Sequence, residues 1–259
     1  MYRGCTVAVV MPLHNEQAQI EGAVKRVPAL VDLILAVDDA STDLSLEVLS
    51  AIEDKRLWVL AHETNGGVGA ATKTGYRHAL SAGVDLIAVM DGDGQMDGRD
   101  LTRLLDCAID SSDYAKGNRF LDPDTIGRMP RVRYIGNRVF SYLTRLAAGA
   151  ASQNASLDAH CGYTVIRRAA LERLALDELY DRYGFPTEIF FAALRSRLRV
   201  RCVPVRTIYG DEVSGIHPLR VVPAVLYIIA RAYVRRRILE RRSAPDFGRP
   251  DRTECHLET

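Results

Sequence analysis

Two acidic pairs stand at the ends of apolar segments of the sequence. Asp91-Gly92-Asp93 follows the apolar run at 86–90, and Asp38-Asp39 ends the run at 31–37. Two carboxylates spaced by one glycine can converge on one hard cation, and Mg²⁺ or Mn²⁺ held this way takes further oxygens from water and from substrate phosphates. Gln95 offers another oxygen ligand. Such a pair alone fits a solvated turn as well, so the choice between a metal site and a turn depends on the neighbouring motifs.

A group of arginines lies further along the chain and could recognise phosphate. Arg119 ends another apolar segment, and Arg133 lies in the polar stretch that follows it. A guanidinium group suits bidentate phosphate binding, and we expect these two to act in that way. The neighbouring arginines at 128, 131 and 138 fit a solvated surface equally well.

The elements that must position these groups alternate between strand and helix from residue 6 to 120. Nearly continuous apolar runs predict strands buried on both faces, at 6–11, 31–37, 57–61, 86–90 and 114–116. This alternation predicts an α/β fold with a mainly parallel central sheet and helices on both faces. Ligands of such sheets bind at the carboxyl ends of strands, where the acidic clusters stand. The clusters therefore point to one site.

The second half of the chain changes its rhythm after Phe120. Residues 121–133 contain two prolines and a glycine and predict a mobile loop. Further elements are predicted as a helix at 134–148, a strand at 162–167, helices around Ala170 and Thr187, and a strand at 199–207. We expect a catalytic domain at 1–218, a basic helix at 219–242 and a disordered tail at 243–259.

Charge and length exclude several classes of protein. The chain of 259 residues has 34 basic and 33 acidic side chains, so it has no overall basic field and we expect no nucleic-acid partner. The start of the sequence shows no signal-peptide pattern, which predicts a cytoplasmic protein.

The C-terminal segment joins an apolar run at 221–230 to an arginine-rich end. The run is about half of the roughly 20 residues that a bilayer-spanning helix needs. It fits either a terminal helix packed on the domain or an interfacial helix whose arginines meet anionic head groups. The second interpretation predicts peripheral attachment to the inner face of a membrane.

Four motifs together carry a resemblance to a known family. They are Pro12-Leu13-His14-Asn15-Glu16, Val37-Asp38-Asp39-Ala40-Ser41-Thr42-Asp43, Asn65-Gly66-Gly67-Val68-Gly69-Ala70 and Met90-Asp91-Gly92-Asp93-Gly94-Gln95. In this order and spacing they resemble the family 2 glycosyltransferases, and among these the dolichol-phosphate mannosyltransferase and polyprenyl-phosphate glycosyltransferase type. The resemblance covers about residues 6–218. It implies a GT-A fold, a UDP- or GDP-hexose donor, Mg²⁺ or Mn²⁺, and inversion at the anomeric carbon.

The resemblance also implies roles for individual residues at the donor end of the site. Pro12, Glu16 and Asp39 are similar to residues that contact the base and ribose of the donor, while Asp91, Asp93 and Gln95 are similar to the metal site, with Asp91 also near the donor. His14 stands where the family usually has tyrosine and would stack on the base. Asp38 is expected to close the strand end by hydrogen bonds.

At the acceptor end, Arg119 and Arg133 correspond to arginines that meet the donor diphosphate or the acceptor phosphate. Asp158 matches the family's later acidic motif. It would be the general base for a hydroxyl acceptor. For a lipid phosphate, which is already largely ionised, it would only position groups. The loop at 209–216, with Ser214, resembles a segment that closes over the site.

The interpretation favoured by these residues is transfer of a hexose from a nucleotide-diphosphate sugar to a polyprenyl phosphate at the membrane surface. A soluble hydroxyl acceptor, a nucleotidyltransferase and a non-catalytic nucleotide-sugar sensor remain alternatives. The glycine run at 66–69 also resembles a dinucleotide fingerprint, but it follows the third predicted strand rather than the first. A tight turn with close helix packing is favoured there.

Overall fold

The computed structural model describes residues 1–149, 157–208 and 218–243, without side-chain detail at 218–220 and 239–243. A seven-stranded sheet has the order β3-β2-β1-β4-β6-β5-β7, and only β6 runs antiparallel to its neighbours. The strands are β1 Val7–Leu13, β2 Leu33–Asp38, β3 Leu57–Ala61, β4 Leu86–Val89, β5 Tyr114–Asn118, β6 Thr164–Arg167 and β7 Val200–Pro204. The predicted α/β fold with a mainly parallel sheet is confirmed.

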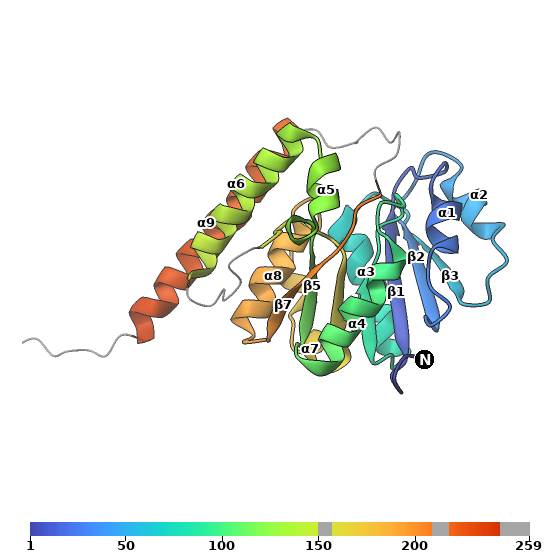
Figure 1. The fold of residues 1–259 in the computed structure, drawn as a ribbon, viewed down its shortest axis with the longest axis horizontal. Helices are drawn as coiled ribbons and strands as arrows, with labels where there is room; N and C mark the ends of the chain where they lie inside the picture. Colours follow the sequence, from blue (N-terminus) through green and yellow to red (C-terminus); the bar gives the residue numbers. More distant parts are fainter. Residues whose placement is uncertain (150–156, 209–217, 244–259) are drawn as a thin grey trace, which may run out of the picture.

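Helices cover both faces of this sheet (Figure 1). One core contains the side chains of Val9 and Met11 from β1 together with those of α1, α2 and α4, and the other contains Ala8 and Val10 with α3, α7 and α8. Successive side chains of β1 thus enter opposite cores, as the period of a strand requires. The helices are α1 Ile20–Lys25, α2 Ser45–Ser50, α3 Val68–Ser81, α4 Leu101–Asp110, α7 Arg168–Leu171 and α8 Phe185–Arg195, with 3-10 turns η1 Gly98–Asp100 and η4 Leu176–Glu178.

The segment at 121–133, predicted as a mobile loop, is largely helical. A 3-10 turn, η2 Arg119–Leu121, leads into α5 Pro123–Arg128, and α6 Arg131–Ala148 begins three residues before its predicted start. The reason lies in Asp122, whose carboxylate accepts a hydrogen bond from the backbone N–H of Thr125 at 2.9 Å. Pro123 occupies the first turn, where its missing N–H costs nothing.

The C-terminal helix α9 Pro218–Ser243 lies along α6, and the pair extends away from the sheet (Figure 1). Val225 and Ile228 of α9 are fully buried in a third core with Phe190 and Phe191 of α8. Part of the apolar run at 221–230 is therefore protein core. The loop with Ser214 and, after Ser243, the tail predicted as disordered lie outside the described residues.

Candidate active site

A cavity of about 1110 Å³ opens at the carboxyl ends of β1, β4 and β5. Parallel strands end at the same edge of a sheet, so polar segments far apart in the sequence meet there. Nine of the ten residues that the sequence predicted for the site line this cavity: Pro12, His14, Glu16, Asp39, Asp91, Asp93, Gln95, Arg119 and Arg133. The structure places the tenth, Asp158, behind the wall of the cavity.

The acidic pair after β4 forms the floor of the predicted metal site. Burial, and then the negative charges of Asp93 and Glu16, raise the pKa of Asp91 to about 7, against the opposing effect of Arg119. The backbone N–H of Gln95 donates to Asp93 Oδ1 at 2.9 Å, which orients that carboxylate. These hard oxygen donors suit Mg²⁺ or Mn²⁺, and a cation there would offset the mutual repulsion of the carboxylates.

The protein alone supplies few ligands at this place. Within the described part of the chain, no group of three or more His, Cys, Asp or Glu side chains is arranged to hold a metal ion. A cation bound at Asp91 and Asp93 would therefore depend on oxygens from water and from a substrate, which is common for Mg²⁺ sites.

Gly162 lets the backbone before β6 approach the acidic pair. A Cβ at this position would lie 3.1 Å from Asp91 Oδ2 and 3.4 Å from the Cε of Met96. The segment that contains Asp158 is thus packed against Asp91, and a side chain at 162 would push the carboxylate away.

Asp39 is buried in the wall and held by three donors. The backbone N–H groups of Gly66 and Gly67 donate to its carboxylate at 2.9 and 2.6 Å, and His62 Nδ1 lies 2.7 Å from Oδ1. The glycine run therefore makes a tight turn around Asp39, as the favoured interpretation expected. His62 was missed because nothing in its sequence surroundings singles it out.

The same glycine run brings a distant segment into the cavity. Gly67 has φ +97°, and a Cβ at Gly69 would lie only 2.5 Å from the carbonyl oxygen of Tyr180. Ala70 N–H donates to the carbonyl of Asp181 at 3.0 Å. This packing places further residues in the cavity wall that the sequence did not indicate: Tyr180, Arg182, Tyr183 and Pro186.

The rim at the end of β1 is organised by backbone contacts. His14 is exposed, and its Nδ1 lies 2.9 Å from the carbonyl oxygen of Asp39. The backbone N–H of Glu16 donates to Ser45 Oγ at 2.8 Å. Asp38 accepts hydrogen bonds from the N–H and hydroxyl of Ser41, so it closes the strand end as expected. His14 is also among the residues that line the cavity.

Arg119 and Asp158 form a buried, bidentate ion pair. Nε and Nη2 of Arg119 donate to the two carboxylate oxygens at 2.6 and 2.9 Å, and the carboxylate is fully buried. Burial acts to raise the pKa of Asp158, but the charge and hydrogen bonds of Arg119 outweigh it, so the pKa is lowered from 3.8. Asp158 therefore holds the guanidinium from behind while Arg119 lines the cavity.

Lys116 supports this arrangement from the interior of β5. Its ammonium group is fully buried and donates to the carbonyl of Cys161 at 2.6 Å, and burial lowers its pKa. The turn between Asp158 and Gly162 is thus held by two cationic side chains. The sequence placed Lys116 in a strand but indicated no role for it.

Arg133 reaches the cavity from the first turn of α6, and two further arginines line it from other elements. Arg206 is held by Asp100, whose carboxylate accepts from Nη2 at 2.6 Å, and Arg182 comes from the segment after η4. The cavity lining therefore combines carboxylates with guanidinium groups, which are the groups that hold a divalent cation and a diphosphate.

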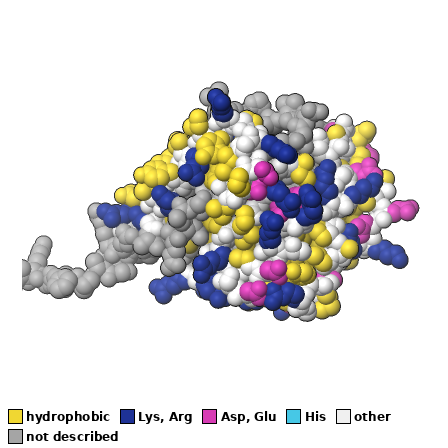
Figure 2. All heavy atoms as spheres, in the orientation of Figure 1, with side chains coloured by type: hydrophobic (Ala, Val, Ile, Leu, Met, Phe, Trp, Pro, Cys, Tyr) yellow, Lys and Arg dark blue, Asp and Glu magenta, His cyan; other side chains and the backbone are white. Residues whose placement is uncertain are grey.

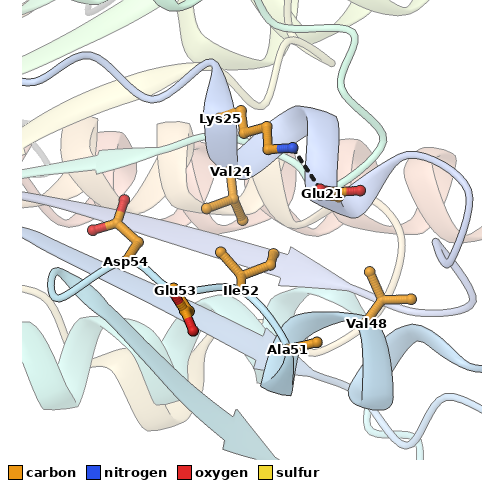
Figure 3. A pocket seen from close by; sticks show the side chains of 8 residues that line it. All are labelled: Glu21, Val24, Lys25, Val48, Ala51, Ile52, Glu53 and Asp54. Carbon is orange, nitrogen blue, oxygen red and sulfur yellow. Dashed lines mark hydrogen bonds and ion pairs between the residues drawn. The ribbon is translucent and has the colours of Figure 1, made fainter.

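A second hollow, of about 640 Å³, lies between α1 and α2 (Figure 3). Apolar side chains of Val24, Val48 and Ile52 line it beside the Glu21–Lys25 pair. It contains none of the residues predicted for the site and no arginine. The residues predicted for the site line the cavity at the strand ends instead.

An open α/β sheet with acidic groups and arginines at its strand ends is the architecture of an enzyme that handles phosphorylated ligands. Comparison with known proteins makes the class specific: the model of the family "Glycosyl transferase family 2" matches residues 8–175. The chain belongs to this family and is a glycosyltransferase.

Curated relatives are similar over most of their length. The chain is 28% identical to UDP-N-acetylglucosamine–dolichyl-phosphate N-acetylglucosaminyltransferase of Methanococcus voltae, covering 79% of this chain and 86% of that protein. It is 28% identical to polyprenol monophosphomannose synthase of Mycolicibacterium smegmatis, with coverage of 76% and 75%. It is 29% identical to undecaprenyl-phosphate mannosyltransferase of Micrococcus luteus, with coverage of 81% and 88%.

Solved structures agree on the fold. Glucosyl-3-phosphoglycerate synthase from Mycobacterium tuberculosis, in complex with Mn²⁺, UDP and glucosyl-3-phosphoglycerate, superposes with a TM-score of 0.63 at 19% identity, covering 90% of this chain and 80% of that one. The predicted GT-A fold is confirmed.

Proposed function

We propose that the protein is an inverting, metal-dependent glycosyltransferase that moves a hexose from a UDP- or GDP-sugar to a polyprenyl phosphate at the inner face of a membrane. The observation that carries this proposal is one cavity whose lining combines the acidic residues after β1 and β4 with Arg119 and Arg133. The named relatives that act on dolichyl, polyprenol or undecaprenyl phosphates support the choice of acceptor.

In this proposal the donor is bound by the residues that follow β1, β2 and β4. Pro12, His14, Glu16 and Asp39 surround the nucleoside, with His14 stacked on the base. Asp91, Asp93 and Gln95 would hold a divalent cation. When bound, Mg²⁺ or Mn²⁺ would neutralise negative charge on the leaving diphosphate.

In this proposal the acceptor phosphate is bound by guanidinium groups. Arg119 and Arg133 would bind it so that one oxygen faces the anomeric carbon opposite the diphosphate. That oxygen forms the new bond to the anomeric carbon as the bond to the diphosphate breaks, which inverts the configuration. The phosphate is already ionised near neutral pH, so no base is needed. Asp158, which is fully buried behind Arg119, acts as a positioning residue.

The test is an incubation of the purified protein with labelled UDP- and GDP-hexoses, Mn²⁺ and detergent-solubilised polyprenyl phosphate. We expect label in the organic phase, and its loss on chelation or in Asp93→Asn. Asp106→Asn is the matched control. Asp106 lies on α4, pairs with Arg3 and is not among the residues that line the cavity. It should retain transfer.

Three results would overturn the proposal. Label that appears only on a water-soluble hydroxyl compound would assign a soluble acceptor. Release of pyrophosphate from a nucleoside triphosphate, without sugar transfer, would assign a nucleotidyltransferase. Donor binding without turnover on any acceptor tried would leave a sensor.

A further inference from the structure

The helix α6 exposes a stripe of large hydrophobic side chains. Its small residues Ser141, Thr144, Ala147 and Ala148 are buried on the side that faces the rest of the protein. The opposite side carries five residues, alternately three and four positions apart, each at least half exposed: Val132, Ile135, Val139, Tyr142 and Leu146. This spacing places all five on one face of the helix. Below, these five residues are called the α6 stripe.

The surroundings of the stripe carry positive charge. The sequence of α6 contains four arginines and no acidic residue, and that of α9 contains seven arginines and only Glu240. Figure 2 shows hydrophobic side chains gathered along α6 with basic side chains among them. Arginine guanidinium groups also lie over tyrosine rings, Arg145 at 5.7 Å from the centroid of Tyr142 and Arg236 at 5.5 Å from that of Tyr233. Apolar, aromatic and arginine side chains together are typical of surfaces that lie in a membrane interface.

The structure shifts the expected lipid contact from α9 to α6. The apolar start of α9 suggested an interfacial helix, but Val225 and Ile228 are buried against α8. Glu188 of α8, itself buried, forms an ion pair with Arg231 at 2.6 Å and ties α9 to the domain. The α6 stripe has no such partner among the described residues.

The stripe begins at the mouth of the active site. Val132, the most exposed residue of the stripe at 86%, directly precedes Arg133, which lines the cavity. A ligand whose phosphate binds at Arg133 can therefore extend an apolar chain along the outer face of α6. No helix of the described part of the chain is long and apolar enough to cross a bilayer.

We propose that the α6 stripe lies on an anionic lipid bilayer and, with the arginine-rich end of α9, holds the cavity mouth at the membrane surface. This inference rests on the proposed function and names the surface through which the lipid acceptor is reached. A second copy of the chain fits the stripe less well, because two such surfaces would bring arginines against arginines without acidic partners.

The experiment is co-sedimentation of the full-length protein with phosphatidylcholine vesicles, with and without phosphatidylglycerol. The variant is Ile135→Gln with Val139→Gln, which removes apolar surface and keeps residues suited to a helix. We expect binding that requires phosphatidylglycerol, and at least about tenfold weaker binding by the double variant. Trp58→Gln is the matched control: Trp58 is 60% exposed on β3, at the opposite edge of the sheet. It should bind like the wild type.

Urea unfolding shows whether the double variant is folded, and transfer to a detergent-solubilised polyprenyl phosphate separates this inference from the proposed function. If the double variant transfers sugar normally in detergent but binds vesicles as tightly as the wild type, the inference is wrong and the proposed function stands. If the wild type binds vesicles through the stripe but transfers no sugar to the lipid phosphate in any medium, the proposed function is wrong and the lipid surface stands. A wild-type dimer that the double variant dissociates, with vesicle binding unchanged, would assign the stripe to a second copy.

Discussion

Replacing Asp158 by asparagine tests whether this residue positions Arg119 or acts in the reaction itself. The substitution keeps the size of the side chain but removes a charge that is fully buried and bonded to Arg119 at 2.6 and 2.9 Å. It removes the carboxylate that pairs with the guanidinium of Arg119, which is only 8% exposed, and that attracts the buried ammonium of Lys116. Breaking a buried pair from one side costs about 3–5 kcal/mol. A typical domain has about 5–15 kcal/mol of stability in total, so the effect should be large in urea unfolding.

The control is Asp113→Asn. Asp113 also accepts two hydrogen bonds from one guanidinium, that of Arg199, and a third from the backbone N–H of the same residue, but the guanidinium is 62% exposed. A surface pair contributes about 1 kcal/mol or less, so this variant should unfold close to the wild type. We also expect the Asp158→Asn and Arg119→Gln effects on stability to be strongly non-additive in the double variant. If Asp158→Asn unfolds like the wild type while sugar transfer is lost, Asp158 takes part in the chemistry and the positioning role is wrong.

Two further predictions concern the same region. Gly162→Ala would place a Cβ 3.1 Å from Asp91 Oδ2. Calorimetry should therefore show about tenfold weaker binding of a nucleoside diphosphate with Mn²⁺. Gly136→Ala is the control and should leave this binding unchanged, because nothing lies within 4 Å of a Cβ at that position. Burial lowers the pKa of His160 to about 4 from 6.5, so the unfolded state takes up a proton first as the pH falls through this window. The wild type should then lose up to about 3 kcal/mol of stability between pH 6.5 and 4 in urea titrations, and His160→Gln should lose less; equal losses would contradict the assigned burial effect.

The sequence predicts the framework of the site well because its buried strands form continuous apolar runs that can be recognised in the sequence. The runs that form β1, β2 and β4 are buried on both faces, so they are almost entirely apolar. Glu16, Asp39 and Asp91 stand in the polar segments that follow these runs. The rule that parallel strands present their carboxyl ends at one edge then brings these residues together. The sequence does not show how segments later in the chain fold back to the cavity. Tyr180 and Arg182 reach the cavity only because Gly67 and Gly69 leave room for their backbone.

The same limit explains why the sequence left two interpretations open for α9 and indicated no surface for α6. The apolar run of α9 is continuous, which looks like a lipid contact, but continuity is also what burial against α8 requires. The stripe of α6 is interrupted by Arg133 and Arg138 and therefore looks like part of an ordinary amphipathic helix packed on the domain. Only the packing shows that Ser141, Thr144, Ala147 and Ala148 face the protein while the α6 stripe stays exposed. For this chain the pattern of hydrophobicity identifies the helices, while the tertiary packing decides which apolar face remains for a partner.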